Sequence, residues 1–445
     1  MIHKVLIANR GEIAVRIIRS CREMGIKTVA IYSTADRHAM HVRMADQSVC
    51  VGPPESSESY LNVPSILSAI EITDADSVHP GYGFMAENPA FAEICENYGV
   101  KFIGPSSEAI RLMGDKIEAR RTVQKVKVPV VPGSNAAITE EDEGLKVSKD
   151  IGFPVIIKAA AGGGGRGMKI VHSPASFINA FLTAQSEALS AFGVPDVFIE
   201  KYFEQSRHVE VQIMGDRFGN VIHLGDRDCS VQRRHQKLIE EAPAPFIPAR
   251  TRNRLCKAAV DAATAVNYNN VGTVEFLYVP DGEFYFLEMN TRIQVEHPVT
   301  EAITGVDIVR EQIRIADGKK LRFGQKDIHL RGHAIECRIN AEDPDSFVPC
   351  PGTIRSCHFP GGFGVRMDTA IYPGCTVPPN YDSLLGKLIV HGEDRNEAIM
   401  RMRRALDELQ IDGVKTTIDF HKRMMNNTDF TEGRLWTNFM AKART

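Results

Sequence analysis

The chain has 445 residues, a net charge of −3 and an apolar fraction of 43%. This length predicts several domains with packed cores, and the nearly balanced charge argues against nucleic acid as a partner because it creates no overall basic field. Nine cysteines without a Cys-x-x-Cys pair argue for a reducing compartment and against a disulfide framework or structural zinc. The first apolar run is short and no stretch approaches a membrane span, so we expect a cytoplasmic protein.

Residues 1–113 alternate strand and helix patterns. Apolar runs at 5–8 and 28–32 predict strands, and an apolar stripe over 12–24 predicts the helix between them. This βαβ start predicts a Rossmann-like domain with a parallel sheet. Gly11 alone occupies the first turn, which makes a dinucleotide site there a weak hypothesis. The turn-rich segment 77–91 is expected at a strand end, where ligands of α/β proteins bind.

Residues 158–169 read KAAAGGGGRGMK, a glycine run beside Lys158 and Arg166. Glycine allows close backbone approach, and the two cations suit phosphate, although a flexible surface loop is the plain alternative. A Walker loop is excluded because no glycine precedes Lys-Ser or Lys-Thr. A dinucleotide fingerprint is excluded because the β-branched run 168–171 follows instead of a helix. The order strand, glycine loop, strand predicts a flap laid over a nucleotide.

A Pro/Gly-rich break at 126–142 suits a hinge before this flap. We therefore predict a nucleotide-binding region over 114–330 that contains a mobile lid over 131–203. A β-rich C-terminal domain is predicted over 331–445, with a last helix over 396–409 whose methionines are core residues.

The segment 272–298 predicts a β-hairpin around the turn Pro-Asp-Gly at 280–282. A two-residue turn places Glu275 directly across from Glu288, with Cβ atoms about 5 Å apart, whereas a three-residue turn places them on opposite faces. A divalent cation would turn repulsion between facing carboxylates into attraction, and hard oxygen ligands near phosphate indicate Mg²⁺ or Mn²⁺. Two solvated strand carboxylates are the alternative.

Polar residues continue at every second position after the hairpin, at Glu288, Asn290, Arg292, Gln294 and Glu296. In an extended chain they share one face, and their varied chemistry favours a reaction row over a solvated surface. The basic segment 226–237 lacks the interleaved aromatics of a nucleic-acid patch, so an anionic small-molecule site fits better.

Together these motifs closely resemble the biotin carboxylase component of bacterial acetyl-CoA carboxylase, from IANRGEIAVRI at 7–17 to YDSLLGKLIVHGEDR at 381–395. The resemblance implies an α/β and α+β ATP-grasp fold with a Rossmann-like N-terminal domain, a mobile glycine-flap subdomain and a β-rich C-terminal domain. It implies that MgATP phosphorylates bicarbonate to carboxyphosphate, which carboxylates biotin on a separate carrier protein as the first step of malonyl-CoA synthesis. A subunit of a pyruvate or another acyl-CoA carboxylase, a biotin-independent ATP-grasp ligase and a regulatory nucleotide-binding module are the alternatives.

The resemblance also implies partners and the attachment of biotin. The expected partners are the biotin carboxyl carrier protein, carboxyltransferase subunits and a second copy of the chain. No covalent biotin is expected, because the nearest match to an Ala-Met-Lys-Met turn, Gly167-Met168-Lys169, belongs to the flap.

The resemblance further implies the site residues by motif match. Those implied for ATP are Lys116, Lys158, Gly162, Gly163, Gly164, Gly165, Gly167, Glu200, Lys201, Phe203, His208, Gln232, His235, Glu275, Leu277 and Glu288. Those implied for the metal are Glu275, Glu288 and Asn290. Those implied for bicarbonate are Lys237, Arg292, Gln294, Val295 and Glu296, with Glu296 as general base and Lys237 and Arg292 holding the anion.

At the biotin end the resemblance implies Arg338, with Tyr82 and Asp382 in nearby segments. Because Glu336, Arg338 and Asn340 share one face of a predicted strand, a salt bridge to Glu336 is the alternative role for Arg338. The chain departs from the family pattern in Phe203, where leucine is common, and in one additional residue in the hairpin turn.

Overall fold

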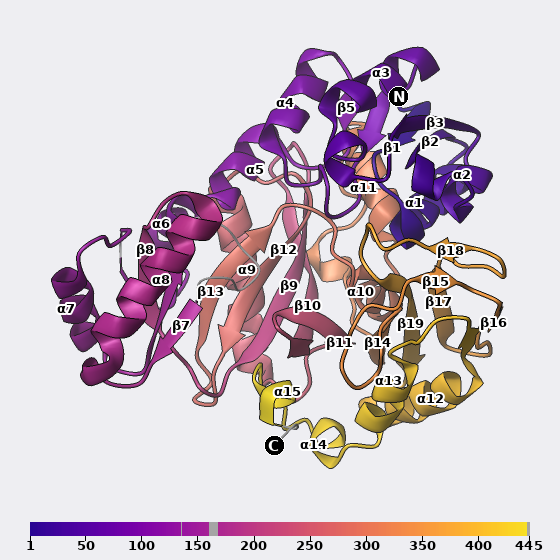
Figure 1. Cartoon of the computed structure of the whole chain (residues 1–445). Coiled ribbons are helices and arrows are strands. Elements are labelled where there is room, and N and C mark those ends of the chain that lie inside the picture. Colours follow the sequence, from indigo (N-terminus) through magenta and orange to yellow (C-terminus); the bar gives the residue numbers. More distant parts are fainter. Residues whose placement is uncertain (135, 160–167, 443–445) are drawn as a thin grey trace.

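The computed structural model describes residues 1–134, 136–159 and 168–442. Figure 1 shows the N-terminal region at the top, a large sheet in the centre, the lid projecting to the left, and the C-terminal helices at the lower right. Within those ranges, no helix combines the length and the apolar character needed to cross a membrane.

The N-terminal region is built on a five-stranded sheet in the order β3-β2-β1-β4-β5, and all its strand pairs are parallel. Its strands are β1 (Lys4–Ile7), β2 (Lys27–Ser33), β3 (Gln47–Gly52), β4 (Ser77–His79) and β5 (Lys101–Phe102). Its helices are α1 (Gly11–Glu23), α2 (Met40–Met44), α3 (Val63–Thr73) and α4 (Pro89–Asn97). The predicted parallel sheet is confirmed, and the turn-rich segment does follow the end of β4.

Helix α1 forms where the apolar stripe predicts it, because Ile13, Ile17, Ile18 and Cys21 bury one side against the sheet. Its first residue, Gly11, has φ of +67°, a backbone conformation that glycine adopts at low cost. This tight entry brings the residues around Gly11 to the carboxyl ends of β1 and β4, where a ligand site is expected.

Helices α5 (Ser107–Gly114) and α6 (Lys116–Lys125) lead from the N-terminal region to the lid. The lid sheet has the order β7-β6-β8, with antiparallel pairs. Its elements are α7 (Glu141–Ile151), β6 (Val155–Ala159), β7 (Met168–Val171), α8 (Phe177–Phe192) and β8 (Val197–Lys201). The two strands that flank the glycine run therefore pair as a hairpin, and the lid has its own apolar core around Phe177 and Phe181.

The central sheet has eight strands, and all their pairings are antiparallel. In spatial order they are β13 (Phe284–Asn290), β12 (Asn270–Tyr278), β9 (Arg207–Gly215), β10 (Val221–Arg233), β11 (Gln236–Ala242), β14 (His333–Asn340), β19 (Leu384–Gly392) and β17 (Val365–Thr369). The predicted boundary at 330–331 lies in the connection before β14. Because β11 pairs with β14, the sheet continues across that boundary without a break.

The remaining elements surround this sheet. The helices are α9 (Ala249–Ala265), α10 (His297–Thr304), α11 (Ile308–Ala316), α12 (Arg395–Glu408), α13 (Ile418–Met425), α14 (Thr428–Thr431) and α15 (Phe439–Lys442). The short strands are β15 (Gly352–Thr353), β16 (Ser356–His358), β18 (Thr376–Val377) and β20 (Gln410–Asp412). Strand β9 alternates, so that Val209, Val211 and Ile213 pack in the core with α9 while His208 and Glu210 face the other way.

The β12–β13 hairpin has a three-residue turn. The Val279 N–H donates to the Glu283 carbonyl at 3.0 Å, and Gly282 has φ of +87°. Such a turn alone would separate the two glutamates onto opposite faces. A β-bulge at Leu287 shifts the register, however, so Phe276 pairs with Phe286 while Glu275 pairs with Glu288. The facing carboxylates expected from a two-residue turn are present, but the bulge and not the turn produces them.

Candidate active site

One cavity of about 980 Å³ lies between the N-terminal region, the lid, the central sheet and the C-terminal segment. Every predicted site residue that the structure describes lines it: Tyr82, Lys116, Lys158, Glu200, Lys201, Phe203, His208, Gln232, His235, Lys237, Glu275, Leu277, Glu288, Asn290, Arg292, Gln294, Val295, Glu296, Arg338 and Asp382. The predicted flap glycines, Gly162, Gly163, Gly164, Gly165 and Gly167, lie outside the described residues.

At the lid end of the cavity, Glu200 on β8 is held by two cations. Its carboxylate accepts hydrogen bonds of 2.5 Å from Lys158 on β6 and from Arg120 on α6. Burial opposes ionisation, but Lys158 and Arg120 outweigh it and hold the pKa of Glu200 below its usual range. The ion pairs tie the lid to α6 and leave Lys158 at the cavity wall.

The same end has an apolar wall suited to a flat heterocycle. Ile156, Met168 and Leu277 line the cavity, and Phe203 stacks on Tyr285 with ring centroids 5.1 Å apart and an interplanar angle of 14°. The Lys201 ammonium, in contrast, donates to backbone carbonyls of the lid, those of Gly152 at 3.0 Å and Phe153 at 3.1 Å. Lys201 therefore has a structural contact in addition to its place in the wall.

The β10–β11 turn brings basic residues to the cavity through an unusual backbone. Arg233 pairs with Gln236, and the two turn residues, Arg234 and His235, have φ of +48° and +66°. Such two-residue turns normally take glycine or asparagine, so these side chains occupy a costly conformation. Gln232, just before the turn, and His235 within it line the cavity.

Behind this turn, Lys237 lies at the centre of an acidic cluster. Its ammonium donates to Glu210 at 2.6 Å, to Glu296 at 2.6 Å and to Glu275 at 2.9 Å. Burial alone would lower the pKa of Lys237, but the three carboxylates raise it well above its usual value. Lys237 is therefore a permanent cation in the middle of the cavity floor.

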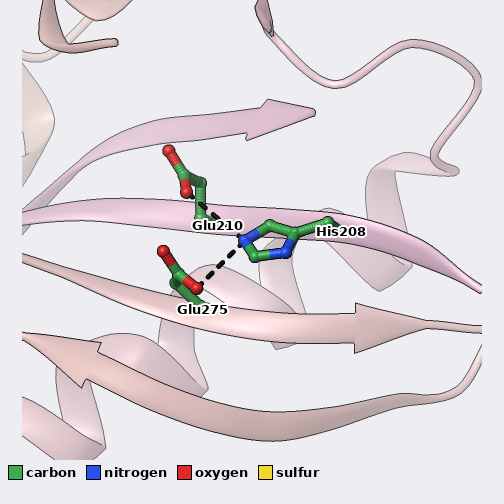
Figure 2. A group of neighbouring side chains, drawn as sticks. All are labelled: His208, Glu210 and Glu275. Carbon is green, nitrogen blue, oxygen red and sulfur yellow. Dashed lines mark ion pairs between the residues drawn. The ribbon is translucent and has the colours of Figure 1, made fainter. Parts of the chain in front are cut away.

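Figure 2 shows His208 and Glu210 on β9 facing Glu275 on the neighbouring strand β12. The His208 Nε2 atom lies 3.1 Å from Glu275 and 3.6 Å from Glu210. Although burial lowers the pKa of this imidazole, Glu275 is the main opposing influence, and the pKa is raised to about 9. These three side chains could also bind a metal ion, but a charged imidazole already compensates the two carboxylates, so the group does not require one.

The predicted metal residues lie beside that group. Glu288 faces Glu275 across the hairpin and opens into the cavity. The surrounding cavity walls reduce the hydration of its carboxylate and, together with repulsion from Glu275, raise its pKa. Asn290 is buried and its amide oxygen accepts from Arg292 at 2.7 Å. Two carboxylates and an amide oxygen form a hard-oxygen set, and a bound cation would relieve the repulsion within it. These residues therefore fit Mg²⁺ or Mn²⁺.

The prediction that residues 288–296 form one extended segment is wrong. Strand β13 ends at Asn290, the chain then bends, and α10 begins at His297 with a proline in its first turn. Glu87 stabilises the bend because its carboxylate accepts from the Thr291 N–H at 3.1 Å and from Arg292 Nε at 2.8 Å. The prediction that the row shares one site holds nevertheless, since all five polar side chains line the cavity.

At the end opposite the lid, Arg338 on β14 connects two buried glutamates. Its guanidinium donates to Glu240 at 2.6 Å through Nε and to Glu296 at 2.9 Å through an Nη atom. The proposed alternative partner, Glu336, is fully buried but makes no hydrogen bond with its carboxylate atoms in the described structure. Glu240 and Glu336 face each other across β11 and β14, and burial raises the pKa of Glu240 to about 7 despite Arg338.

Several site residues escaped sequence reasoning. Glu210 and Glu240 hold the cavity cations, and Arg120 and Glu87 fix Glu200 and Arg292. The alternation in RHVEVQIM over 207–214 places Glu210 on the face of His208, so it could have been found by period two. Glu87 had no such signal, because its partner Arg292 is 205 positions away.

Three family models match the chain in succession. They are "Biotin carboxylase, N-terminal domain" over residues 1–110, "Carbamoyl-phosphate synthase L chain, ATP binding domain" over 115–323, and "Biotin carboxylase C-terminal domain" over 336–442. Together the matches cover nearly the whole chain, including every described residue of the cavity.

Relatives and solved structures agree with these matches. The chain is 58% identical to the biotin carboxylase of Nostoc sp. over 438 residues, covering 98% of each chain. It resembles a biotin carboxylase–β-γ-ATP complex from Campylobacter jejuni with a TM-score of 0.96 and 52% identity, covering 99% of each chain. It also resembles the biotin carboxylase domain dimer of Hydrogenobacter thermophilus 2-oxoglutarate carboxylase with MgADP, ADP and bicarbonate, with a TM-score of 0.95 and 48% identity, covering 100% of this chain and 98% of that one. The predicted ATP-grasp fold is confirmed.

Proposed function

The chain belongs to the biotin carboxylase family of ATP-dependent carboxylating ligases, and from this premise we propose the chemistry of its cavity. ATP phosphorylates bicarbonate to carboxyphosphate, and the carboxyl group then passes to N1 of biotin on a separate carrier protein. The observation that carries this proposal is one continuous cavity in which Lys237, Glu296 and Arg338 join the lid end to the C-terminal end.

ATP occupies the lid end. Its adenine lies against Phe203, Leu277 and the segment of Glu200 and Lys201, and its phosphates approach Lys116 and Lys158. His208, Gln232 and His235 complete the nucleotide site. Closure of the lid would bring Lys158 over the phosphates and exclude water from the reaction.

Glu275, Glu288 and Asn290 would hold Mg²⁺ or Mn²⁺ beside the phosphates. When bound there, such an ion would neutralise charge on the transferring phosphoryl group. The protein contributes the paired carboxylates, which the Leu287 bulge presents on one face.

Bicarbonate binds in the centre, between Lys237, Arg292, Gln294 and Val295. Glu296 is the general base: burial alone would raise its pKa, but Lys237 and Arg338 keep the pKa below its usual value, so the carboxylate is ionised and ready to accept a proton. Its two oxygens are each held by a cation, Lys237 on one side and Arg338 on the other. These ion pairs fix the base for proton transfer from bicarbonate to Glu296, while Lys237 and Arg292 hold the anion for attack on the phosphorus atom.

Biotin enters at the C-terminal end, past Tyr82 and Asp382. When N1 loses its proton to the phosphate released from carboxyphosphate, negative charge develops on the ureido oxygen. The Arg338 guanidinium, held by Glu240 and Glu296, is a fixed cation that stabilises this charge as it develops, which raises the rate more than the affinity.

The proposal extends to the partners and the cellular role. The chain works as a cytoplasmic homodimer that accepts biotin from a carrier protein and delivers carboxybiotin to carboxyltransferase subunits of acetyl-CoA carboxylase. The matches to biotin carboxylase domains on both sides of the ATP-binding domain favour this assignment over a biotin-independent ligase. A pyruvate or another acyl-CoA carboxylase is the second candidate, since a similar solved structure is the biotin carboxylase subunit of a pyruvate carboxylase.

The test is ATP turnover with bicarbonate, with and without free biotin. We expect bicarbonate-dependent phosphate release that biotin accelerates and that requires Mg²⁺ or Mn²⁺. Reconstitution with the carrier and carboxyltransferase subunits of each candidate system then identifies the carboxyl acceptor. Phosphate release that does not respond to bicarbonate would contradict the proposal.

A further inference from the structure

Arg227 on β10 is a fully buried guanidinium beneath the cavity floor. It donates through Nε to Glu210 at 2.5 Å, through Nη1 to Gln212 at 2.7 Å and Thr300 at 2.9 Å, and through Nη2 to Thr273 at 3.1 Å and Gln294 at 2.7 Å. Arginine has five N–H donors, so all of them are satisfied. A buried charge requires such compensation, and here one side chain ties four strands or helices together.

Two of these five bonds lead directly to the cavity. Glu210 is one of the three carboxylates around Lys237, and Gln294 lines the cavity. The Gln294 amide nitrogen donates to Glu275 at 2.7 Å while its oxygen accepts from Arg227. Arg227 itself lies below the lining and is outside the cavity.

The chemistry of these partners determines which way the Gln294 amide points. A guanidinium only donates hydrogen bonds, so the amide atom facing Arg227 must be the oxygen. An ionised carboxylate only accepts, so the atom facing Glu275 must be the nitrogen. Glu275 also accepts a hydrogen bond from the Lys237 ammonium at 2.9 Å, as a carboxylate oxygen does. The oxygen is thus held in the floor and the nitrogen at the cavity, where it can donate to an anion.

We infer that Arg227 is a positioning residue for the anion site: it holds the Gln294 amide with its N–H₂ group toward bicarbonate. The inference rests on the proposed function for the identity of the anion. Without the planar fork of Arg227, the amide oxygen loses its anchor and can turn to the cavity, where it repels an anion. Lysine cannot replace the fork, because one ammonium does not reach both Glu210 and Gln294 with arginine's fixed geometry.

Arg252 provides a matched control. It also pairs with a buried strand carboxylate, donating to Asp226 at 2.9 Å through Nε, and it donates to the Ala244 carbonyl at 2.6 Å. Asp226 is the direct sequence neighbour of Arg227, but Arg252 does not line the cavity. R252K therefore measures the cost of losing a half-buried arginine fork in the same strand region without the link to Gln294.

The experiment compares wild type, R227K, R252K, Q294L and the double variant R227K/Q294L in the full chain. Two readouts are used: the KM values for bicarbonate and ATP in phosphate release, and the rise in melting temperature that bicarbonate produces. We expect R227K to raise the bicarbonate KM about tenfold or more, the size of losing one charge-assisted contact, with the ATP KM changed less than about twofold. R252K should leave the bicarbonate KM unchanged even if its melting temperature falls by a similar amount.

The double variant tests whether Arg227 acts through Gln294. If it does, R227K/Q294L has the same bicarbonate KM as Q294L alone, since the interaction is already lost. The inference is wrong if the bicarbonate KM of R227K is unchanged, or if the fold-changes of R227K and Q294L multiply in the double variant. In either case the proposed function still holds, provided that the wild type shows bicarbonate-dependent turnover. The opposite result is also possible: bicarbonate raises the melting temperature of the wild type but not of R227K, and the wild type shows no turnover. That result supports the inference and contradicts the proposed function. R227M is a second variant if R227K does not fold, and it should also lose the response to bicarbonate.

Discussion

Replacing Arg338 by glutamine removes the cation that separates Glu240 from Glu296. Their side chains are 0% and 2% exposed, and Arg338 is 16% exposed. If Arg338 stabilises the developing charge on biotin, R338Q lowers biotin carboxylation about a hundredfold or more, the effect of losing one such donor. ATP affinity should change much less, because the lid end of the cavity keeps all its contacts. Bicarbonate-dependent phosphate release measured without biotin should fall less than carboxylation does, because Lys237 still holds the other oxygen of Glu296.

The same substitution also destabilises the protein, and the structure indicates by how much. Breaking a buried ion pair on one side costs about 3–5 kcal/mol when the remaining charge stays buried. The pKa of Glu240 is about 7 even with Arg338 in place, mainly because the side chain is buried. Without Arg338 it rises further, so near pH 7 Glu240 takes up a proton. We therefore expect the low end of that range at pH 7, with a further loss of up to about 1.4 kcal/mol per pH unit above it.

A second substitution separates the catalytic role from the structural one. E240Q removes the stranded carboxylate while keeping its shape, so R338Q/E240Q should recover most of the melting temperature that R338Q loses. It should not recover biotin carboxylation. The assays are thermal unfolding at several pH values, nucleotide binding by calorimetry, and carboxylation of free biotin. If carboxylation returned together with stability in the double variant, Arg338 would be a structural ion-pair partner and the reasoning would be wrong.

Three further predictions concern the metal, a buried acid and biotin. E275Q and E288Q should each raise the Mg²⁺ concentration needed for half-maximal phosphate release, and E275Q should have the larger effect because it also contacts Lys237; unchanged Mg²⁺ titrations in both would exclude the hairpin site. Burial raises the pKa of Glu336 well above its usual value, so its folded form binds a proton that the unfolded chain releases above about pH 4.3, and stability falls as pH rises. E336Q should therefore gain melting temperature relative to wild type between pH 5 and about 8, and parallel profiles would refute this. The intact mass should show no biotin adduct, and a mass increase matching biotin would contradict a separate carrier.

Local sequence patterns predicted those helices and strands whose formation depends on residues close in sequence. The helical stripe of α1, the strands flanking the glycine run and the β14 strand all follow from period and composition, because packing there agrees with local preference. The sequence also predicted that Glu275 faces Glu288 across the hairpin if the turn has two residues. The Leu287 bulge that produces this arrangement was not predictable, since a bulge depends on how the sheet packs as a whole.

The sequence predicted which residues line the site better than it predicted the backbone and the ion pairs that position them. The motif residues all reach one cavity, yet the bend after Asn290 depends on Glu87, which approaches only when the N-terminal region docks on the hairpin. Similarly, Arg338 pairs with Glu240 and Glu296 and not with its strand neighbour Glu336, because the register of β11 against β14 places Glu240 within reach. Such partners belong to tertiary structure and leave little trace in the local sequence.

The continuity of the central sheet limits how the chain can be divided. Domain matches end at residue 323 and resume at 336, which makes the interval a natural place to cut for separate expression. A cut there, however, would strip β11 of its neighbour β14, so each fragment would present a long unpaired strand edge to solvent. Bare edges of this kind pair with other chains. The two fragments should therefore aggregate when made alone and remain soluble when produced together, with β11 and β14 recombining as the seam between them.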